Sequence, residues 1–196
     1  MTGRFEKGND RMEGISGILL TGGKSTRMGT DKASLPFGNG TLLTVQLEKF
    51  RALGITDVLI SGHGDGQIPD DVPGCGPLGG LAACLPRVQN PCALVISVDV
   101  PLVPVGALSA LIAAHTAGAT LLRHGERLEP LIAVYDTALG VTARRLLTEG
   151  RRAVRALLDL TDWRAFDPGA PEEAFLNCNT PEAYAAALRM IGGYDA

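Results

Sequence analysis

Short apolar runs recur along the chain, and each is bounded by glycine, proline or charged residues. Runs of this length and uniform hydrophobicity are typical of strands buried inside a parallel sheet. They predict strands at residues 15–20, 57–62 and 92–100. Two later runs, 119–125 and 128–135, lie close enough in the chain to pair as a hairpin.

Amphipathic stretches separate the apolar runs and predict helices. The clearest one begins at Thr41, which can serve as its N-cap, and ends at Gly54. Leu43, Leu47 and Phe50 would form its buried face. The pattern predicts further helices at residues 81–85, 105–118, 136–147 (capped by Asp136) and 152–160, and a last one that opens at Thr180-Pro181-Glu182.

The alternation of strands and helices determines the expected fold class. Strands that follow one another through helices need crossover connections, which are right-handed and place the strands parallel. We therefore predict one three-layer α/β/α domain with a mostly parallel sheet, covering residues 15–196, with the late hairpin as an insertion or a mixed edge. Residues 1–14 mix both charges without an apolar core, so they predict a mobile N-terminal arm and not a signal peptide.

Composition narrows the possible functions. The chain of 196 residues has 45% hydrophobic and 20% charged residues, the balance of an ordinary globular domain. Its net charge of -3 and its 5% of aromatic residues disfavour nucleic-acid binding. Four scattered cysteines without a C-x-x-C pair indicate reduced thiols, and they favour neither a disulfide scaffold nor a zinc site. No apolar run approaches the ~20 residues that span a membrane, so we expect a cytoplasmic protein.

The segment LLTGGKSTRMGTDK, residues 19–32, follows the first predicted strand and resembles a phosphate-binding loop. It is not a Walker A loop, because that pattern needs a glycine at the position that Ile18 occupies. Glycines 22 and 23 would let backbone N–H groups approach a ligand closely. Arg27 and Lys32 can neutralise phosphate oxygens, so we predict a phosphate site after the first strand.

A second candidate is Asp99, at the end of the most apolar run. A carboxylate in such a place needs a partner, and magnesium takes one or two carboxylates together with substrate phosphate oxygens. Because ligands of open α/β sheets bind at the carboxyl ends of strands, Asp99 and the loop should share one site. The match of GCGPLG to a dinucleotide fingerprint is discounted, because no strand leads into it. The three histidines have no ligand or triad spacing.

Six segments occur in an order that carries a family resemblance. The first is LLTGGKSTRMGTDK, and the others are IPDDVPGCGPLGGL, SVDVP, RLEPLIAVY, EGRRAV and FLNCNTPE. Together they resemble the nucleotidyltransferase family of molybdenum cofactor guanylyltransferase, the MobA-like NTP transferases. The resemblance extends from about Ile18 to Ala187. Two departures are small: valines flank Asp99 where cysteine and threonine or methionine are common, and GPLGG replaces GPLAG.

The resemblance implies a Rossmann-like nucleotidyltransferase that joins GMP from GTP to the terminal phosphate of molybdopterin and releases pyrophosphate, with Mg²⁺ as cofactor. It further implies transient contacts with proteins that deliver the pterin and with recipient molybdoenzymes. A strong general base is unnecessary for this reaction, because the attacking phosphate is already anionic near neutral pH. The lack of a plausible catalytic histidine is in keeping with that chemistry.

The resemblance also implies roles for individual residues. Arg27 and Lys32 would hold the GTP phosphates, and Asp99 would bind the metal; these three are the catalytic candidates. The nucleotide contacts would include Leu20, Thr21, Gly22, Gly23 and Asp70, with Asp71 the weaker alternative to Asp70. The pterin substrate would contact Asn177, Asn179 and Arg152.

Alternatives remain at this point. Gly22-Gly23 favours guanine, since cytidylyl relatives usually have Ala-Gly there. A related enzyme could use CTP with molybdopterin, or act on a sugar or polyol phosphate. A non-catalytic GTP-binding module would keep the fold but lose its metal site, whereas Asp99, Lys32 and Arg27 are all present here.

Overall fold

The computed structural model describes residues 14–21 and 32–192. Within these residues the main sheet has six strands in the order β4-β1-β5-β7-β6-β8. The strands are β1 (Ile15–Leu20), β4 (Val58–Ser61), β5 (Cys92–Ser97), β6 (Ala119–His124), β7 (Arg127–Asp136) and β8 (Trp163–Phe166). A short hairpin, β2 (Pro36–Phe37) with β3 (Gly40–Thr41), lies outside this sheet. The predicted α/β class with a mostly parallel sheet is confirmed.

Strand direction identifies the edge of the sheet where a site can form. β1 pairs parallel with β4 and β5, and β6 pairs parallel with β8. β7 is antiparallel to both β5 and β6, so β6 and β8 run in the same direction as β1. The predicted hairpin of β6 and β7 is therefore present, but β7 lies inside the sheet. The carboxyl ends of five strands meet at one edge.

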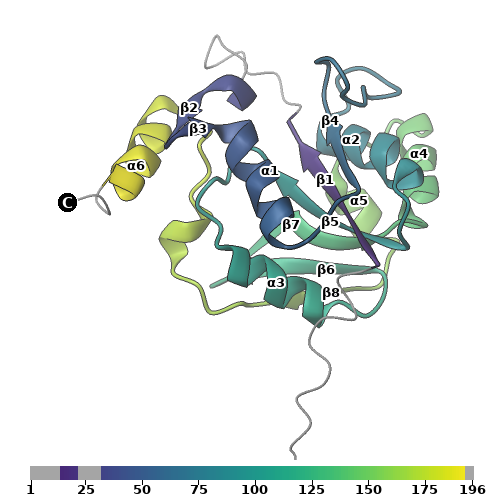
Figure 1. Ribbon diagram of the computed structural model, residues 1–196. Coiled ribbons are helices and arrows are strands. Elements are labelled where there is room, and N and C mark those ends of the chain that lie inside the picture. The colour runs from purple at the N-terminus through teal and green to yellow at the C-terminus, as the bar shows by residue number, and fades with distance from the viewer. Residues whose placement is uncertain (1–13, 22–31, 193–196) are drawn as a thin grey trace, which may run out of the picture.

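Helices cover both faces of the sheet (Figure 1). The described helices are α1 (Leu42–Ala52), α2 (Pro77–Cys84), α3 (Val105–Ala114), α4 (Leu139–Thr148), α5 (Val154–Leu158) and α6 (Pro181–Gly192). Three short 3-10 turns add η1 (Lys32–Ser34), η2 (Leu85–Arg87) and η3 (Glu172–Phe175). One apolar cluster joins the sheet to α1, α3 and α6, and a second joins its other face to α2, α4 and α5. These are the three predicted layers.

Helix α1 confirms its predicted cap and corrects its predicted face. The Thr41 hydroxyl accepts a hydrogen bond from the backbone N–H of Thr44, as the N-cap prediction requires. The fully buried residues of the helix, however, are Leu42, Gln46, Lys49 and Phe50. Leu43 and Leu47 are only partly buried. The helix is rotated relative to the prediction because two polar residues, Gln46 and Lys49, find partners inside the protein.

Other boundaries also differ from the prediction. Helix α2 begins at Pro77, earlier than predicted, so Gly79 and Gly80 are helical. Asp136 does not cap α4: it ends β7, where its carboxylate accepts a hydrogen bond from the N–H of Gly118 at 2.6 Å. Strand β8 was not predicted, because its exposed edge position does not need an apolar run.

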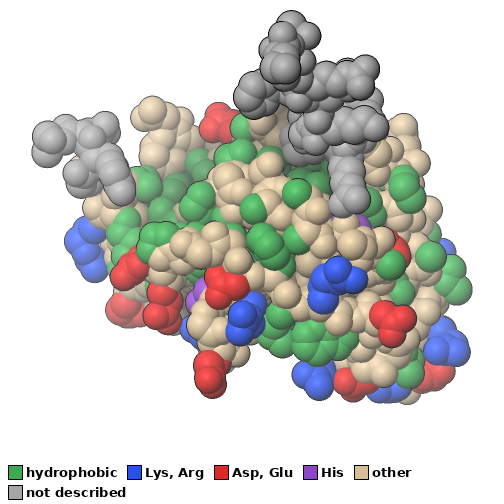
Figure 2. All heavy atoms as spheres, turned by 90° about the horizontal axis from the view of Figure 1, so that it is seen from below, with side chains coloured by type: hydrophobic (Ala, Val, Ile, Leu, Met, Phe, Trp, Pro, Cys, Tyr) green, Lys and Arg blue, Asp and Glu red, His purple; other side chains and the backbone are tan. Residues whose placement is uncertain are grey.

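The described helices and surface bear on the other predictions. None of the helices in residues 14–21 and 32–192 is long and apolar enough to cross a membrane. On the face shown in Figure 2, acidic and basic side chains alternate, so the basic ones form no continuous patch there. Residues 1–13 lie outside the described residues, so the N-terminal arm and the domain boundary remain predictions.

Candidate active site

The carboxyl ends of β1, β4 and β5 bring several predicted site residues together. Leu20 is the last residue of β1, and its carbonyl accepts a hydrogen bond from the N–H of Val98 at 3.0 Å. Thr21 donates to the Ser61 carbonyl at the end of β4, from its N–H at 3.1 Å and its hydroxyl at 2.7 Å. The start of the predicted phosphate loop is thus tied to both neighbouring strands. Gly22, Gly23 and Arg27 lie outside the described residues.

Asp99 lies in the turn that follows β5, beside the end of β1. Its carboxylate oxygen Oδ1 is buried and has no hydrogen-bond partner among the described residues. A buried carboxylate oxygen without a partner is costly, and a divalent cation would satisfy it. No group of three or more His, Cys, Asp or Glu side chains able to hold a metal occurs in the described part of the chain. A single carboxylate with a free oxygen atom can hold a Mg²⁺ ion that takes its other ligands from water and phosphate oxygens.

Lys32 is linked to the same turn by a segment that is far away in the sequence. Its ammonium Nζ donates to the side-chain oxygen Oδ1 of Asn179 at 2.7 Å. The neighbouring Cys178 donates its N–H to the carbonyl of Asp99 at 2.7 Å. The segment between η3 and α6 thereby joins the end of the phosphate loop to the turn that carries Asp99. Lys32, Asp99 and Asn179 form one group.

Cys178 lies inside this group but is not a nucleophile. Its thiol is buried, and burial together with the Asp99 carboxylate raises the pKa of Cys178 to about 11, while Lys32 acts in the opposite direction. The thiol therefore stays protonated near neutral pH. Its role is to pack, and its backbone N–H holds the Asp99 turn.

The structure distinguishes Asp70 from Asp71. Asp71 is exposed and forms ion pairs with Arg87 and Arg144, both at 3.5 Å. Asp70 instead packs against the start of α2: a Cβ atom at Gly79 would lie 2.6 Å from its Oδ2. Burial raises the pKa of Asp70 and the Asp71 charge adds to this, although His63 opposes both. The two neighbouring carboxylates thus lie in different surroundings, Asp71 at the surface and Asp70 against α2.

The pterin candidates are only partly brought together. Asn179 contacts Lys32, whereas the Asn177 amide donates to the carbonyl of Phe175 at 3.4 Å. Arg152 is exposed in the segment between α4 and α5. Within residues 14–21 and 32–192, no hydrogen bond or ion pair joins it to the two asparagines. The grouping of Arg152 with them remains a prediction.

Sequence reasoning missed two residues that shape the site, Ser61 and Gly80. A Cβ atom at Gly80 would lie 2.5 Å from the hydroxyl Oγ of Ser61 and 2.8 Å from Cδ2 of Leu20. Glycine is therefore needed for α2 to pack on the ends of β1 and β4. The pair of glycines directly after Pro77 and Leu78 was the available signal.

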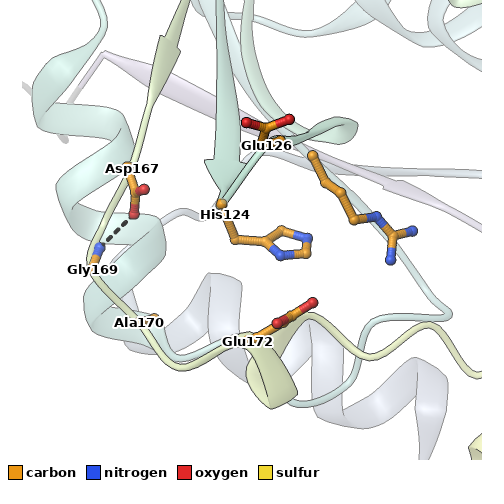
Figure 3. A pocket seen from close by; sticks show the side chains of 8 residues that line it. His124, Glu126, Asp167, Gly169, Ala170 and Glu172 are labelled. Atoms are coloured by element: carbon orange, nitrogen blue, oxygen red, sulfur yellow. Dashed lines mark hydrogen bonds between the residues drawn. The ribbon is translucent and has the colours of Figure 1, made fainter.

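A separate hollow of about 470 Å³ lies at the far end of the same edge, between the β6–β7 turn and the segment after β8. Figure 3 shows His124 pointing into it between Glu126 and Glu172. His124 is held by Glu129, with Nε2 to Oε1 at 3.0 Å, and its ring stacks on Phe175. The lining includes three carboxylates but only one arginine. This charge balance disfavours a triphosphate in this hollow.

Comparisons with known proteins identify the family to which the chain belongs. The family described as the MobA-like NTP transferase domain matches residues 17–166. The chain is 32% identical over 179 residues to a molybdenum cofactor guanylyltransferase of Xanthomonas euvesicatoria pv. vesicatoria (strain 85-10), covering 88% of this chain and 94% of the relative.

Two solved structures share the fold at 20% sequence identity. One is molybdopterin-guanine dinucleotide biosynthesis protein A from Archaeoglobus fulgidus, with a TM-score of 0.75 over 91% of this chain and 99% of that chain. The other is Rv0371c from Mycobacterium tuberculosis H37Rv in complex with manganese, with a TM-score of 0.65 over 89% and 97%. From the matched residues, the identity to the relative and the shared fold, the chain is a nucleotidyltransferase that belongs to the MobA-like NTP transferase family.

Proposed function

We propose that this protein transfers GMP from GTP to the terminal phosphate of molybdopterin and releases pyrophosphate. The observation that carries the proposal is the group formed by Asp99, Lys32 and Asn179 at the carboxyl edge of the sheet. The relative from Xanthomonas, named as a molybdenum cofactor guanylyltransferase, supports the choice of substrates. GTP and molybdopterin would meet at this edge, in the cytoplasm.

The proposed cofactor is Mg²⁺, held by Asp99. The buried, unpartnered Oδ1 atom of this residue supports the assignment. The manganese complex of the M. tuberculosis neighbour is in keeping with a divalent ion on this fold. When bound, the ion would supply charge neutralisation for phosphate oxygens.

The chemistry is a substitution at the α-phosphorus of GTP. A molybdopterin phosphate oxygen forms a new P–O bond, the bond between the α-phosphorus and the bridging oxygen breaks, and pyrophosphate leaves with that electron pair. The residues mainly have to align the groups and neutralise charge. Lys32 can exchange the neutral Asn179 oxygen for a phosphate oxygen, because a bond between two charged groups is stronger. Arg27, outside the described residues, is proposed as the second cation.

The remaining proposed contacts follow the same edge. The nucleotide would lie against Leu20, Thr21, Gly22 and Gly23, and would also contact Asp70, which packs beside Gly79 of α2. Gly22, which lies outside the described residues, is proposed from the sequence alone as a contact of the purine. Asn177, Asn179 and Arg152 are proposed for the pterin substrate, and transient contacts with pterin-delivering proteins and recipient molybdoenzymes would follow from its lability.

The test measures pyrophosphate release with molybdopterin and GTP, CTP or UTP in turn, in the presence of Mg²⁺. We expect turnover with GTP, and a loss of at least ~100-fold, about 2.7 kcal/mol of transition-state stabilisation, in both Asp99→Ala and Lys32→Ala. Asp71→Asn is the matched control, because this carboxylate forms only surface ion pairs. Normal turnover of Asp99→Ala would remove that residue from the metal site. Preference for CTP, or for a sugar phosphate as acceptor, would favour the related activities.

A further inference from the structure

Two polar residues on the buried face of α1, Gln46 and Lys49, have no part in the proposed chemistry. Gln46 is only 1% exposed and Lys49 only 8%. Burying a side-chain amide and an amine costs free energy unless both find partners. Their partners therefore indicate why they are inside the protein.

Gln46 contacts the turn that carries Asp99 at two points. Its side-chain nitrogen donates to the carbonyl of Ser97 and to that of Val100, each at 2.9 Å. These two carbonyls flank Asp99 in the chain. Because both can only accept, the amide nitrogen must face them, and the Gln46 oxygen is left without a partner among the described residues. Gln46 thus clamps both sides of Asp99.

Lys49 adds a third bond one helical turn further along α1. Its Nζ donates to the carbonyl of Pro101 at 2.6 Å. From the opposite sides, Val98 donates to the Leu20 carbonyl and Cys178 donates to the Asp99 carbonyl. The backbone of the turn is therefore held from α1, from β1 and from the segment before α6.

One oxygen of the Asp99 side chain has no such support within the described part of the chain. Its buried Oδ1 has no hydrogen-bond partner among the described residues. The direction of the carboxylate consequently depends on the backbone that carries it. We propose that Gln46 and Lys49 are positioning residues, which fix residues 97–101 so that the Asp99 carboxylate is held ready for the divalent cation. This inference rests on the proposed function only for the identity of the ion site.

Gln46→Met and Lys49→Met keep the side-chain length and remove the donors. We would measure Mn²⁺ affinity in the presence of the α,β-methylene analogue of GTP, and amide hydrogen exchange of residues 97–103 without any ligand. We expect Mn²⁺ affinity to fall at least ~10-fold and exchange of the segment to accelerate at least ~10-fold in Gln46→Met. With GTP and molybdopterin, kcat should fall while the KM for GTP stays within about twofold.

Ser16→Ala is the matched control. Ser16 is fully buried and bonds to Asp57 and Asn90 at the opposite end of β1, so its loss weakens the fold without touching the turn. Wild-type Mn²⁺ affinity and wild-type exchange in both Met variants would overturn the inference. If Gln46→Met folds poorly, Lys49→Met can replace it in both measurements, because it removes only one hydrogen bond to the turn. Asp99→Ala separates the proposed metal site from the proposed positioning role of Gln46 and Lys49. If Asp99→Ala binds Mn²⁺ normally, the metal site is wrong. The hydrogen-exchange result would still test whether Gln46 and Lys49 hold the turn.

Discussion

At the scale of single residues, neighbours in the chain have different tasks. The family resemblance favours Asp70 over its neighbour Asp71, and the structure gives the two carboxylates different surroundings. Asp71 forms surface ion pairs with two arginines. Asp70 lies against Gly79, which has no side chain to displace it. The small residue Gly79 near the start of α2 thus leaves room for the Asp70 carboxylate.

Asp70→Ala tests whether Asp70 contacts the nucleotide, because it removes the carboxylate that lies beside Gly79. We expect the KM for GTP to rise ~10-fold, about 1.4 kcal/mol, with little change in kcat. Asp71→Ala is the control, because the carboxylate of Asp71 forms surface ion pairs with Arg87 and Arg144. An unchanged KM in Asp70→Ala would argue that Asp70 does not contact the nucleotide.

At the scale of elements, α1 combines two roles. Its apolar residues pack into the core beneath β1 and β5, while Gln46 and Lys49 hold the turn after β5. The predicted boundaries of the helix were correct because capping and helix-ending signals are local. Its buried face was predicted only in part: Phe50 is buried as expected, and Leu43 and Leu47 are partly buried against the core. Gln46 and Lys49 were not expected inside, since their acceptors lie about fifty residues further along the chain.

Lys49 makes stability depend on pH in a defined direction. Burial lowers the pKa of Lys49 from 10.5 to about 7. Unfolding restores the ordinary pKa, so between these values the unfolded chain binds one proton more than the folded protein. The free energy of unfolding should therefore rise with pH in this window, by at most ~1.4 kcal/mol per pH unit.

This contribution can be measured by urea unfolding of the wild type and of Lys49→Met at pH 7.5 and pH 8.5. The quantity compared is the change in the free energy of unfolding between the two pH values. Contributions of all other groups cancel when the two proteins are compared. We expect the wild type to gain about 1 kcal/mol over the variant between the two pH values. Equal slopes for both proteins would show that Lys49 titrates normally in the folded state.

At the scale of the whole molecule, the site depends on contacts between distant parts of the chain. Lys32 and Asn179 are 147 residues apart, and the Asp99 turn lies between them in sequence. A ligand that bridges these segments stabilises the folded protein as a whole, because the unfolded chain cannot bind it.

A thermal-shift experiment tests that linkage. GTP with Mg²⁺ at ~100 times its Kd should add about 2.7 kcal/mol of stability, which raises the Tm by ~5–10 °C for a domain of this size. Lys32→Ala should lose most of the shift at the same GTP concentration, whereas Asp71→Asn should retain it. A larger shift with CTP than with GTP would contradict the proposed base preference.

The sequence by itself determined the local features of this protein. Apolar runs located β1, β4, β5 and the β6–β7 pair, and Thr41 and Thr180 correctly marked the starts of two helices. Lys32 and Asp99 were also identified as candidates, because a cation after a glycine-rich loop and an acid after an apolar run are unusual. Periodicity, capping and unusual residue types are properties of neighbouring residues, so they can be read from the chain alone.

Tertiary structure alone decided the rest. It placed β7 between β5 and β6, brought Asn179 to Lys32, and turned the polar residues of α1 toward the Asp99 turn. None of these follows from a local pattern, because a buried polar side chain is stable only beside a partner, and the partner is known only once the distant segments have packed together.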